Sequence, residues 1–575
     1  MIPSSIGRLL GYGMIVLALL GTLGINLFTL AQAARARTSV PFKDQWEFVE
    51  ELAQHGHGKP LWPILWSPFW GNRLVIPRLL FLADARWFSL ASLTWLAVLL
   101  QLVHIALLIA LAWLLLERRS PVLFIIAITV ILNLMLSPFQ MENLVWSMQV
   151  HSPLVYVAAT TAFLCLSLSS RSSGALFLAL CIALGLIASY TMANGTLVWP
   201  VLAVQAIYLR RNRKVVMALA LIGTFVMASY LWHYARPVQL GLGAGGMIRH
   251  PIDAIMLLGL ILGSPFRFTT AADIGVGILT LAAAGYLFYR ASLYLNQQRK
   301  WLSVVFATVL FIFVSALSIV AGRLTPEYVH FGTIDPLPSR YFTMICLFWA
   351  STALLALTTI QAPRPQPWLL CIFGIVFGCL MFRTIVHQLT EAEDWADVYV
   401  GTDALGSAFL LEAPDEQLLS VLWPSKAERE ERIAFLRQHR LAMFHEPRAM
   451  WLGKRVSDLF LPLPDRCTGA IEKTEGLDKS SWRVEGWAWD ADTSSPPDDV
   501  LFTDATGRII GLARGGLRHG YRPGFPIVPQ PVPESHANLR DSEWLGYVRQ
   551  NGDFQFEQVS LYGLFRNKGK VCAIR

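Results

Sequence analysis

Long apolar runs alternate with short polar segments over roughly the first two thirds of the chain. Most runs approach the ~20 residues that an α-helix needs to cross a bilayer. They lie at 9–30, 89–116, 121–137, 153–169, 174–192, 197–209, 215–232, 273–293, 301–321, 341–360 and 367–388. The apolar segment 251–263 is shorter and predicts a re-entrant or interfacial helix. The pattern therefore predicts a polytopic α-helical membrane domain over residues 1–388, with about 11 transmembrane helices.

The first apolar run leaves two alternatives open. It follows Arg8 and ends in AQAARA (31–36), a small-residue stretch typical of a signal-peptide cleavage site. Because the run 9–30 is longer than the usual apolar core of a signal peptide, we favour an uncleaved transmembrane helix.

Basic residues mark every second connection between the runs. Short basic segments occur at Arg8, 117–119, 171–174, 210–214, 297–300 and 363–365. Short basic loops are retained in the cytoplasm, so the N-terminus is predicted to be cytoplasmic. The alternate connections are then external: 34–88, 138–152, 193–196, 233–272, 322–340 and everything after 388. We therefore expect a multi-pass protein of the bacterial inner membrane whose C-terminal region is periplasmic.

After residue 388 the sequence pattern changes twice. Residues 389–460 carry helical patterns and predict a periplasmic helical linker region, in which Ser425 is a candidate N-cap for the helix in 424–444. Residues 461–575 show short alternating runs with a DATG turn at 504–507, which predicts a small antiparallel β-sandwich.

Two cysteines bracket this last region. Cys467 and Cys572 fall on its expected first and last strands, and the periplasm is oxidising, so we favour a disulfide over two free thiols. Closing a loop of this length contributes roughly 4–5 kcal/mol in the chain-entropy model.

Composition agrees with a membrane protein. Hydrophobic residues make up 54% of the chain and charged residues only 15%, more apolar surface than a soluble protein of this length would bury. The formal net charge of +8 follows from the loop pattern and does not indicate a nucleic-acid partner. The remaining five cysteines lie in apolar runs without metal-type spacing.

The first external loop, 34–88, carries the leading candidate for catalysis. Asp44 would lie at the membrane–water boundary as a general base or a metal ligand. Asp44-Gln-Trp-Glu47 also fits a capping box, in which the two carboxylates only begin a helix. Both interpretations stay open, since a cap fixes a carboxylate in place. Trp46 and Glu47 are candidate sugar or acceptor contacts beside it.

External arginines are candidates for phosphate binding. A guanidinium donates two parallel hydrogen bonds, which suits a phosphate. The connection 322–340 offers the best set, and the loop 34–88 offers two more, giving the candidates Arg323, Arg340, Arg73, Arg78 and His330. The alternative for each single arginine is an interfacial anchor.

Polar residues at two other external ends suit a sugar. Glu142, Gln149 and His151 lie in the segment 138–153, and Asn194 lies in 191–200. Polar groups at membrane depth are costly unless they are paired or face a water-filled cavity. The alternative is helix-end turns with interfacial tryptophans.

Several segments, taken in this order, resemble a known class. FKDQWEF, GNRLVIPRLLF, ENLVWSMQV, TMANGTLVWP and SRYFTMICLFW are similar to segments of bacterial membrane proteins placed near the GT-C class of integral-membrane glycosyltransferases. The resemblance covers roughly residues 1–445. It implies a polyprenyl-phosphate-linked sugar as donor and an essential carboxylate in the first loop, which Asp44 matches by position. Many members pair that carboxylate with a second one, but Lys43 and Gln45 flank Asp44 here. No cofactor is certain, and the resemblance leaves a divalent metal open. The C-terminal sandwich resembles carbohydrate-binding modules in architecture.

The expected function is therefore a glycosyltransferase of the periplasmic face, which would move a sugar to a cell-envelope glycan or glycoprotein. The alternatives are a flippase or transporter of lipid-linked sugars, a polymerase or ligase of lipid-linked glycans, and a non-catalytic glycan-binding scaffold.

Overall fold

The computed structural model divides the chain into two compact units. The first, here called the helical unit, comprises Met1–Ala31, Leu61–Leu79 and Thr94–Ala392, and the second, the mixed unit, comprises Gln32–Pro60, Leu80–Leu93 and Glu393–Arg575. The structure describes residues 4–117, 120–169, 174–234, 241–265, 269–294, 298–325, 339–360, 375, 378, 379, 382, 388–463, 467–521, 523, 539, 541, 542–550 and 558–574.

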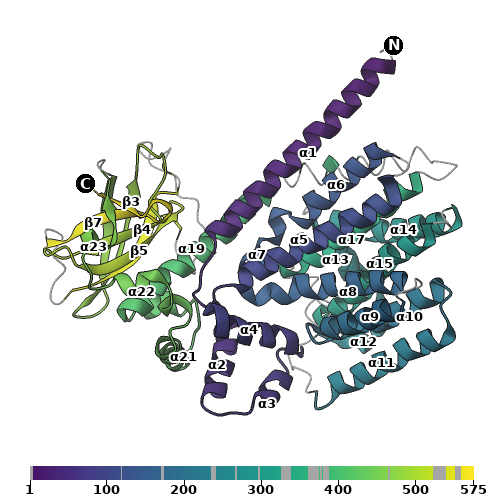
Figure 1. The fold of residues 1–575 in the computed structure, drawn as a ribbon, viewed down its shortest axis with the longest axis horizontal. Helices are drawn as coiled ribbons and strands as arrows, with labels where there is room; N and C mark the ends of the chain where they lie inside the picture. The colour runs from purple at the N-terminus through teal and green to yellow at the C-terminus, as the bar shows by residue number, and fades with distance from the viewer. Residues whose placement is uncertain are drawn as a thin grey trace. The chain divides into compact units, whose positions relative to one another are not determined.

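The helical unit is built from helices that follow the apolar runs (Figure 1). Its longer helices are α1 (Ser4–Arg35), α5 (Leu93–Ala112), α6 (Pro121–Met135), α8 (His151–Leu168), α9 (Gly174–Ser189), α10 (Val198–Tyr208), α11 (Arg213–Leu231), α13 (Pro251–Gly263), α14 (Thr270–Tyr294), α15 (Arg299–Arg323) and α17 (Phe342–Ile360). Short elements fill the connections: α3 (Leu61–Trp66), η1 (Trp113–Glu117), η2 (Pro138–Gln140), α7 (Met141–Val145), η3 (Ser147–Val150), η4 (Ala193–Leu197), α12 (Gly243–Arg249) and η6 (Ser339–Tyr341). Helix α4 (Val75–Phe88) passes from this unit into the mixed unit.

Among the described residues, eight helices are long and apolar enough to cross a membrane. Helices α12 and α13 meet at 112°, and this bent pair would make a ninth span if it crosses. The bend agrees with the re-entrant or interfacial segment predicted at 251–263. The predicted count of about 11 is not confirmed: α9 has 16 residues and α10 only 11, and the predicted span 367–388 lies almost entirely outside the described residues.

Burial separates central helices from peripheral ones. In the most apolar part of each span, 89% of the residues are buried for α17 but only 17% for α11. Helix α11 exposes Leu221 and Phe225, and α14 exposes Leu279. Contiguous apolar surface of this kind is unfavourable in water. The apolar helices therefore fit a multi-pass membrane protein.

Glycines allow a close helix contact in this unit. A Cβ atom on Gly277 of α14 would lie 1.9 Å from the carbonyl oxygen of Gly259 on α13. A Cβ on Gly263 would lie 1.8 Å from the carbonyl oxygen of Asp273. Small residues let two membrane helices pack backbone to backbone, so α13 and α14 form a tight pair.

In the mixed unit, part of the first loop packs on the chain beyond residue 392. Helix α2 (Gln45–Gly56) contacts α21 (Lys426–Gln438). The Trp46 ring meets the Phe409 ring edge-on at 6.0 Å, and Gly406 of α19 (Leu389–Leu411) leaves room for Val40. The other helical elements are α20 (Glu416–Leu419), η8 (Ala442–Phe444), α22 (Pro447–Trp451), α23 (Val456–Leu459) and η11 (Arg566–Lys568). This division differs from the prediction, which kept the whole loop 34–88 in the membrane domain and made 389–460 a separate linker.

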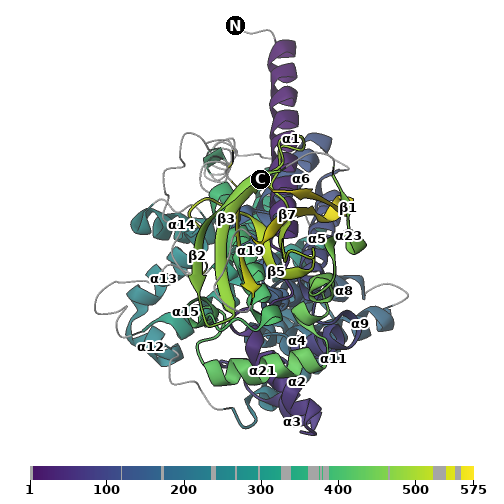
Figure 2. The same cartoon turned by 90° about the vertical axis from the view of Figure 1, so that its left-hand side faces the viewer.

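The C-terminal strands form one sheet of eight strands in the order β1-β8-β7-β4-β5-β6-β3-β2 (Figure 2). They are β1 (Leu461–Pro462), β2 (Thr468–Gly476), β3 (Ser481–Trp489), β4 (Asp499–Thr503), β5 (Ile509–Leu517), β6 (Glu543–Arg549), β7 (Ser560–Phe565) and β8 (Lys570–Ala573). All pairs are antiparallel except β1–β8. The predicted DATG hairpin joins β4 to β5.

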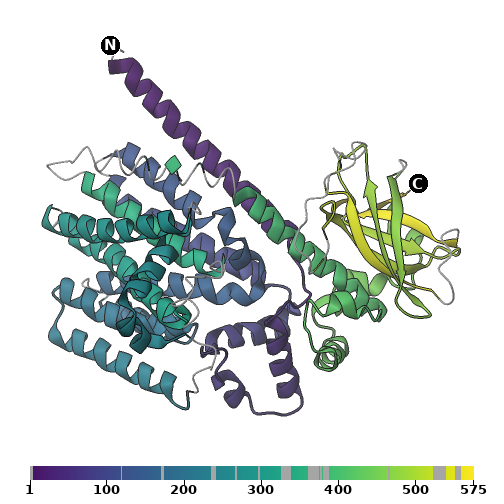
Figure 3. The ribbon, with the colours of Figure 1, turned by 180° about the vertical axis from the view of Figure 1, so that it is seen from behind.

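The two ends of this sheet meet, so it closes like a barrel. Strands β1 and β2 are consecutive pieces of one segment; β1 pairs with β8, while β2 pairs with β3. Cys467, just before β2, also pairs with Ile574 and forms a disulfide with Cys572 of β8, with 5.6 Å between the Cα atoms. Figure 3 shows the curved sheet from the side opposite to the view of Figure 1. The predicted β-region is present, but one closed sheet replaces the expected sandwich of two separate sheets.

Strand β4 is buried on both faces, which explains its unbroken apolar run. Val500 and Phe502 belong to one core cluster with Trp544. Leu501, between them, belongs to a second cluster that packs on Trp451 and Leu459. Successive strand residues point to opposite faces, so the first cluster fills the interior of the sheet and the second lies under α22 and α23.

Candidate functional site

Two turns at one end of the helical unit are tied together by polar side chains. Ser339 of η6 donates a hydrogen bond to the Glu142 carboxylate on α7. The Asn143 amide donates to the Arg340 carbonyl at 3.1 Å and to the Thr343 hydroxyl at 2.8 Å. Glu142 is only 6% exposed. These bonds join the predicted external segment 138–152 to the end of the predicted external connection 322–340.

Two guanidinium groups lie beside one phenol in the same region. The Arg323 side chain is exposed, and its Nε and Nη2 atoms donate to the Tyr341 hydroxyl at 3.3 and 3.2 Å. The guanidinium carbons of Arg323 and Arg340 lie 5.8 and 5.9 Å from the centre of the Tyr341 ring. Within the described ranges, neither arginine pairs with a carboxylate. Both therefore retain donors for an oxyanion.

Histidine 151 adds an imidazole to this region. Its Nδ1 atom lies 2.7 Å from the Met148 carbonyl oxygen, and its ring lies near enough to Arg340 that a proton on the ring would be repelled by that guanidinium. Gln149, two residues earlier in η3, is buried as well. We call the following set the polar end cluster: Glu142, Asn143, His151, Arg323, Ser339, Arg340 and Tyr341.

Asn194 lies in a second polar group that borders the cluster. Its amide donates to the Tyr156 hydroxyl at 3.1 Å and to the Ser315 hydroxyl at 3.3 Å. Tyr156 belongs to the core cluster of the helical unit, and Tyr341 packs against the same cluster. The Asn194 Oδ1 atom is buried and has no hydrogen-bond partner in the described part of the chain. A buried amide oxygen without a donor carries a desolvation cost, so this atom is suited to accept a hydrogen bond from a ligand hydroxyl.

Arg73 has a structural role that its sequence position did not reveal. It is 1% exposed. Its Nε donates to the Tyr230 carbonyl at 2.6 Å, its Nη atoms donate to the carbonyls of Trp66 and Trp232, and its guanidinium lies over the Trp66 ring. Burial lowers the pKa of Arg73 from its ordinary value, although Tyr230 opposes the shift. Its donors are thus used within the protein, which corrects its assignment as a phosphate ligand.

Arg78 is used in the same way. It is 3% exposed and donates from Nη1 to the carbonyls of Leu65 and Ser67 at 3.2 and 2.6 Å. It fastens α3 and the turn after it, so its assignment to the donor phosphate is corrected as well. His330 lies outside the described residues.

Asp44 lies in the mixed unit, at the start of α2. It occupies the N-cap position, but its side chain makes no capping hydrogen bond. The predicted capping box is therefore not formed, and Asp44 is half-buried. Lys43 before it has a left-handed backbone with φ of 47°, a conformation that is uncommon outside glycine.

Glu47 lies in an acidic group with one arginine. Burial raises the pKa of its carboxyl; Arg432 lowers it, and Glu428, Glu51 and Asp44 raise it further. Among the described residues, no three His, Cys, Asp or Glu side chains form a group that could hold a metal ion.

Trp46 is a core residue of the mixed unit. It is 0% exposed and packs against Phe409, so its ring offers no surface on which a sugar could stack. The sequence pattern missed this because the partner ring lies far along the chain.

The site residues chosen from the sequence did not include three members of the polar end cluster: Asn143, Ser339 and Tyr341. Asn143 was visible beside Glu142, and Ser339-Arg340-Tyr341 starts a predicted span, where polar groups are costly unless paired. No protein-family model matches this chain, and no curated protein matches it.

Proposed function

We propose that this protein is a membrane glycosyltransferase that uses a polyprenyl-phosphate-linked sugar at the periplasmic face of the bacterial inner membrane. The observation that carries the proposal is the polar end cluster. There, two arginines without a carboxylate partner in the described ranges lie next to a buried carboxylate, an imidazole and a buried amide.

The cluster has the chemistry that such a donor requires. Arg323 and Arg340 would hold the phosphate, because guanidinium groups match its oxygens and offset the charge that develops as it leaves. Glu142, His151 and Asn194 would hold the sugar hydroxyls. The acceptor would be a cell-envelope glycan or glycoprotein, and the lipid tail of the donor would remain in the bilayer.

The transfer step needs one further group. The acceptor oxygen attacks the anomeric carbon, the bond from that carbon to the phosphate oxygen breaks, and the phosphate leaves with the electron pair. Asp44 is our choice for the base that takes the hydroxyl proton. This role rests on the resemblance of the first loop, in which Asp44 matches the expected carboxylate by position.

The arginines are tested by glycan mass spectrometry. A strain that lacks the protein is complemented with wild type, Arg323→Gln or Arg340→Gln at matched membrane expression. Hydrogen bonds to charged groups contribute ~1.5–3 kcal/mol, so each variant should transfer roughly 10- to 150-fold less sugar. Arg213→Gln, at an exposed position, is the matched control and should restore the glycan fully. Full restoration by both cluster variants would contradict the proposal.

Asp44→Asn separates the enzymatic alternatives. If one glycan loses a fixed sugar mass in the deletion strain and Asp44→Asn does not restore that mass, the result supports a base at position 44. Full restoration by Asp44→Asn, together with failure of the arginine variants, would favour a polymerase or ligase of lipid-linked glycans, which needs arginine but no such base.

A further inference from the structure

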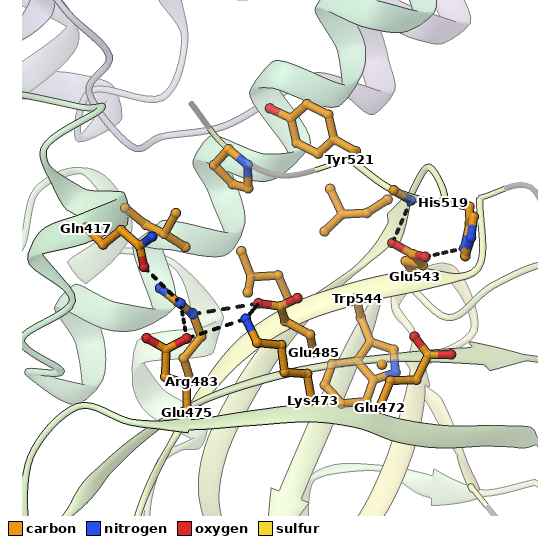
Figure 4. A pocket seen from close by; sticks show the side chains of 16 residues that line it. Gln417, Glu472, Lys473, Glu475, Arg483, Glu485, His519, Tyr521, Glu543 and Trp544 are labelled. Carbon is orange, nitrogen blue, oxygen red and sulfur yellow. Dashed lines mark hydrogen bonds and ion pairs between the residues drawn. The ribbon is translucent and has the colours of Figure 1, made fainter. Parts of the chain in front are cut away.

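A polar cavity of about 420 Å³ lies within the mixed unit, far along the chain from the polar end cluster. Strands β2, β3 and β6, the segment after β5 and helix α20 supply its walls (Figure 4). A volume of this size suits a small ligand.

A β-bulge shapes one wall of the cavity. Strand β2 pairs Ile471 with Gly486 and Lys473 with Glu485, so Glu472 is an extra residue with no partner on β3. Without a bulge, Glu472 and Lys473 would point to opposite faces. With it, both side chains line the cavity, and bulges commonly redirect a side chain in this way.

The basic groups of the cavity are already neutralised. Buried Arg483 donates to Asp415 at 2.8 and 3.0 Å and also bonds Glu475. The Lys473 ammonium lies 3.4 Å from Glu475 and 3.7 Å from Glu485. An anionic ligand would therefore have to displace existing ion pairs.

The opposite side of the cavity has an excess of acid. His519 pairs with Glu543, whose carboxylate also accepts a hydrogen bond from the Gly520 N–H at 3.2 Å. Exposed Glu472 has no ion-pair partner in the described part of the chain. The lining holds four glutamates against one lysine, one arginine and one histidine, so the acidic side chains are in excess and the cavity should repel anions and attract a cation.

An unused donor points to a ligand with hydroxyl groups. Trp544 lines the cavity and is 1% exposed, yet its indole N–H has no hydrogen-bond partner among the described residues. The rest of the wall mixes in apolar surface from Leu418, Leu517, Tyr521, Pro523 and Leu545. Carboxylate acceptors, a free N–H and apolar patches together match a sugar ring, which carries hydroxyls beside C–H faces.

From this geometry we infer that the cavity is a saccharide-binding site that prefers a sugar unit with an amino group and rejects acidic sugars. The site goes beyond the proposed sugar transfer, because it uses none of the residues assigned to that reaction. Glu472 would contact the amino group, and the Trp544 N–H would donate to a sugar oxygen.

The test measures binding without any lipid donor, so that it is independent of transfer. The full-length protein in nanodiscs is titrated at pH 7 with glucosamine, N-acetylglucosamine and glucuronic acid, and binding is followed by saturation-transfer NMR. We expect affinity to fall in that order. An ion pair to an exposed carboxylate contributes ~0.2–1 kcal/mol, so Glu472→Gln should weaken glucosamine about 1.5- to 5-fold and leave N-acetylglucosamine unchanged.

Glu430→Gln is the control, because Glu430 is exposed on α21 outside the cavity. It should leave all three affinities unchanged. Three results would overturn the inference: glucuronic acid binding as tightly as glucosamine, an unchanged glucosamine affinity in Glu472→Gln, or no saturable binding of any of the three sugars.

Discussion

At the scale of single residues, the four arginines predicted to be external have different environments. Arg73 and Arg78 are buried and donate to backbone carbonyls, whereas Arg323 is exposed and Arg340 half-buried beside Tyr341. The Arg73 partner Tyr230 is 157 residues away. Residue type and spacing predicted that external arginines exist, but only the long-range contacts decide which retain their donors.

The half-buried carboxyl of Glu543 gives a prediction at the same scale. Burial raises the pKa of Glu543 to about 7, although His519 opposes the rise. The folded state therefore binds this proton more tightly than the unfolded state, whose ordinary value is 4.5. Its contribution to stability is present below pH 4.5 and is lost as the pH rises through about 7.

Thermal unfolding at pH 5 and pH 8 measures this effect. Between pH 5 and pH 8, the free energy of unfolding should fall by roughly 1–3 kcal/mol more in the wild type than in Glu543→Gln. Each unit of difference in pKa corresponds to about 1.4 kcal/mol. The exposed change Glu430→Gln should retain the wild-type slope. A Glu543→Gln variant with the full wild-type pH dependence would show that the proton is bound elsewhere.

At the scale of elements, apolar periodicity predicted most helices of the helical unit and set 251–263 apart as a short apolar segment, which the structure shows as part of a bent helix pair. It overestimated the lengths of α9 and α10, because the apolar runs also include residues that lie in the turns around these helices, such as those of η4. It also predicted the strands and the DATG hairpin, but not closure of the sheet. Closure depends on the pairing of β1 with β8, which a local pattern does not contain.

A buried ion network connects several elements of the mixed unit. Arg448 of α22 contacts Asp403 of α19 at 2.5 Å and Glu446 at 2.7 Å, and it lies 3.8 Å from Asp499 of β4. Arg514 of β5 also reaches Asp403 at 3.1 Å. Removing one member of a buried pair leaves an uncompensated charge, which costs about 3–5 kcal/mol.

We therefore expect Arg448→Ala to lower the free energy of unfolding by about 3–5 kcal/mol. Denaturant unfolding followed by tryptophan fluorescence measures the change. Lys426→Ala removes an exposed ion pair and should cost less than ~1 kcal/mol. Equal effects from the two variants would mean that the network adds nothing beyond surface charge.

At the scale of the whole molecule, the main surprise is the membership of the first loop in the mixed unit. The predicted boundary at residue 388 followed the change from apolar to polar sequence. Segments 32–60 and 80–93 nevertheless pack with 393–575, because Phe42, Trp46 and Phe48 bury their rings against Tyr399, Phe409 and Phe81. Polarity along the chain shows where a unit leaves the bilayer, but not which distant segment it joins.

A double-mutant cycle tests whether the first loop packs with residues 393–575. Glu50 on α2 lies 3.3 Å from Arg432 on α21, and Arg432 is 5% exposed. The variants Glu50→Ala, Arg432→Ala and their combination should be non-additive by roughly 0.5–2 kcal/mol in unfolding free energy. Additive effects would contradict the packing of α2 on α21. The pair Glu51→Ala with Lys426→Ala is a control for which we expect additivity.

The packing of the first loop also implies a delay between the synthesis of this loop and the synthesis of its packing partners. Thr38 bonds Asp403, a partner 365 residues further along the chain. At ~5–20 residues per second, that partner is made about 20–70 s after the first loop. During this interval the rings of Phe42 and Trp46 have no Tyr399 or Phe409 to cover them. The nascent loop is therefore a natural client for a holding chaperone, and translation rate becomes a determinant of yield.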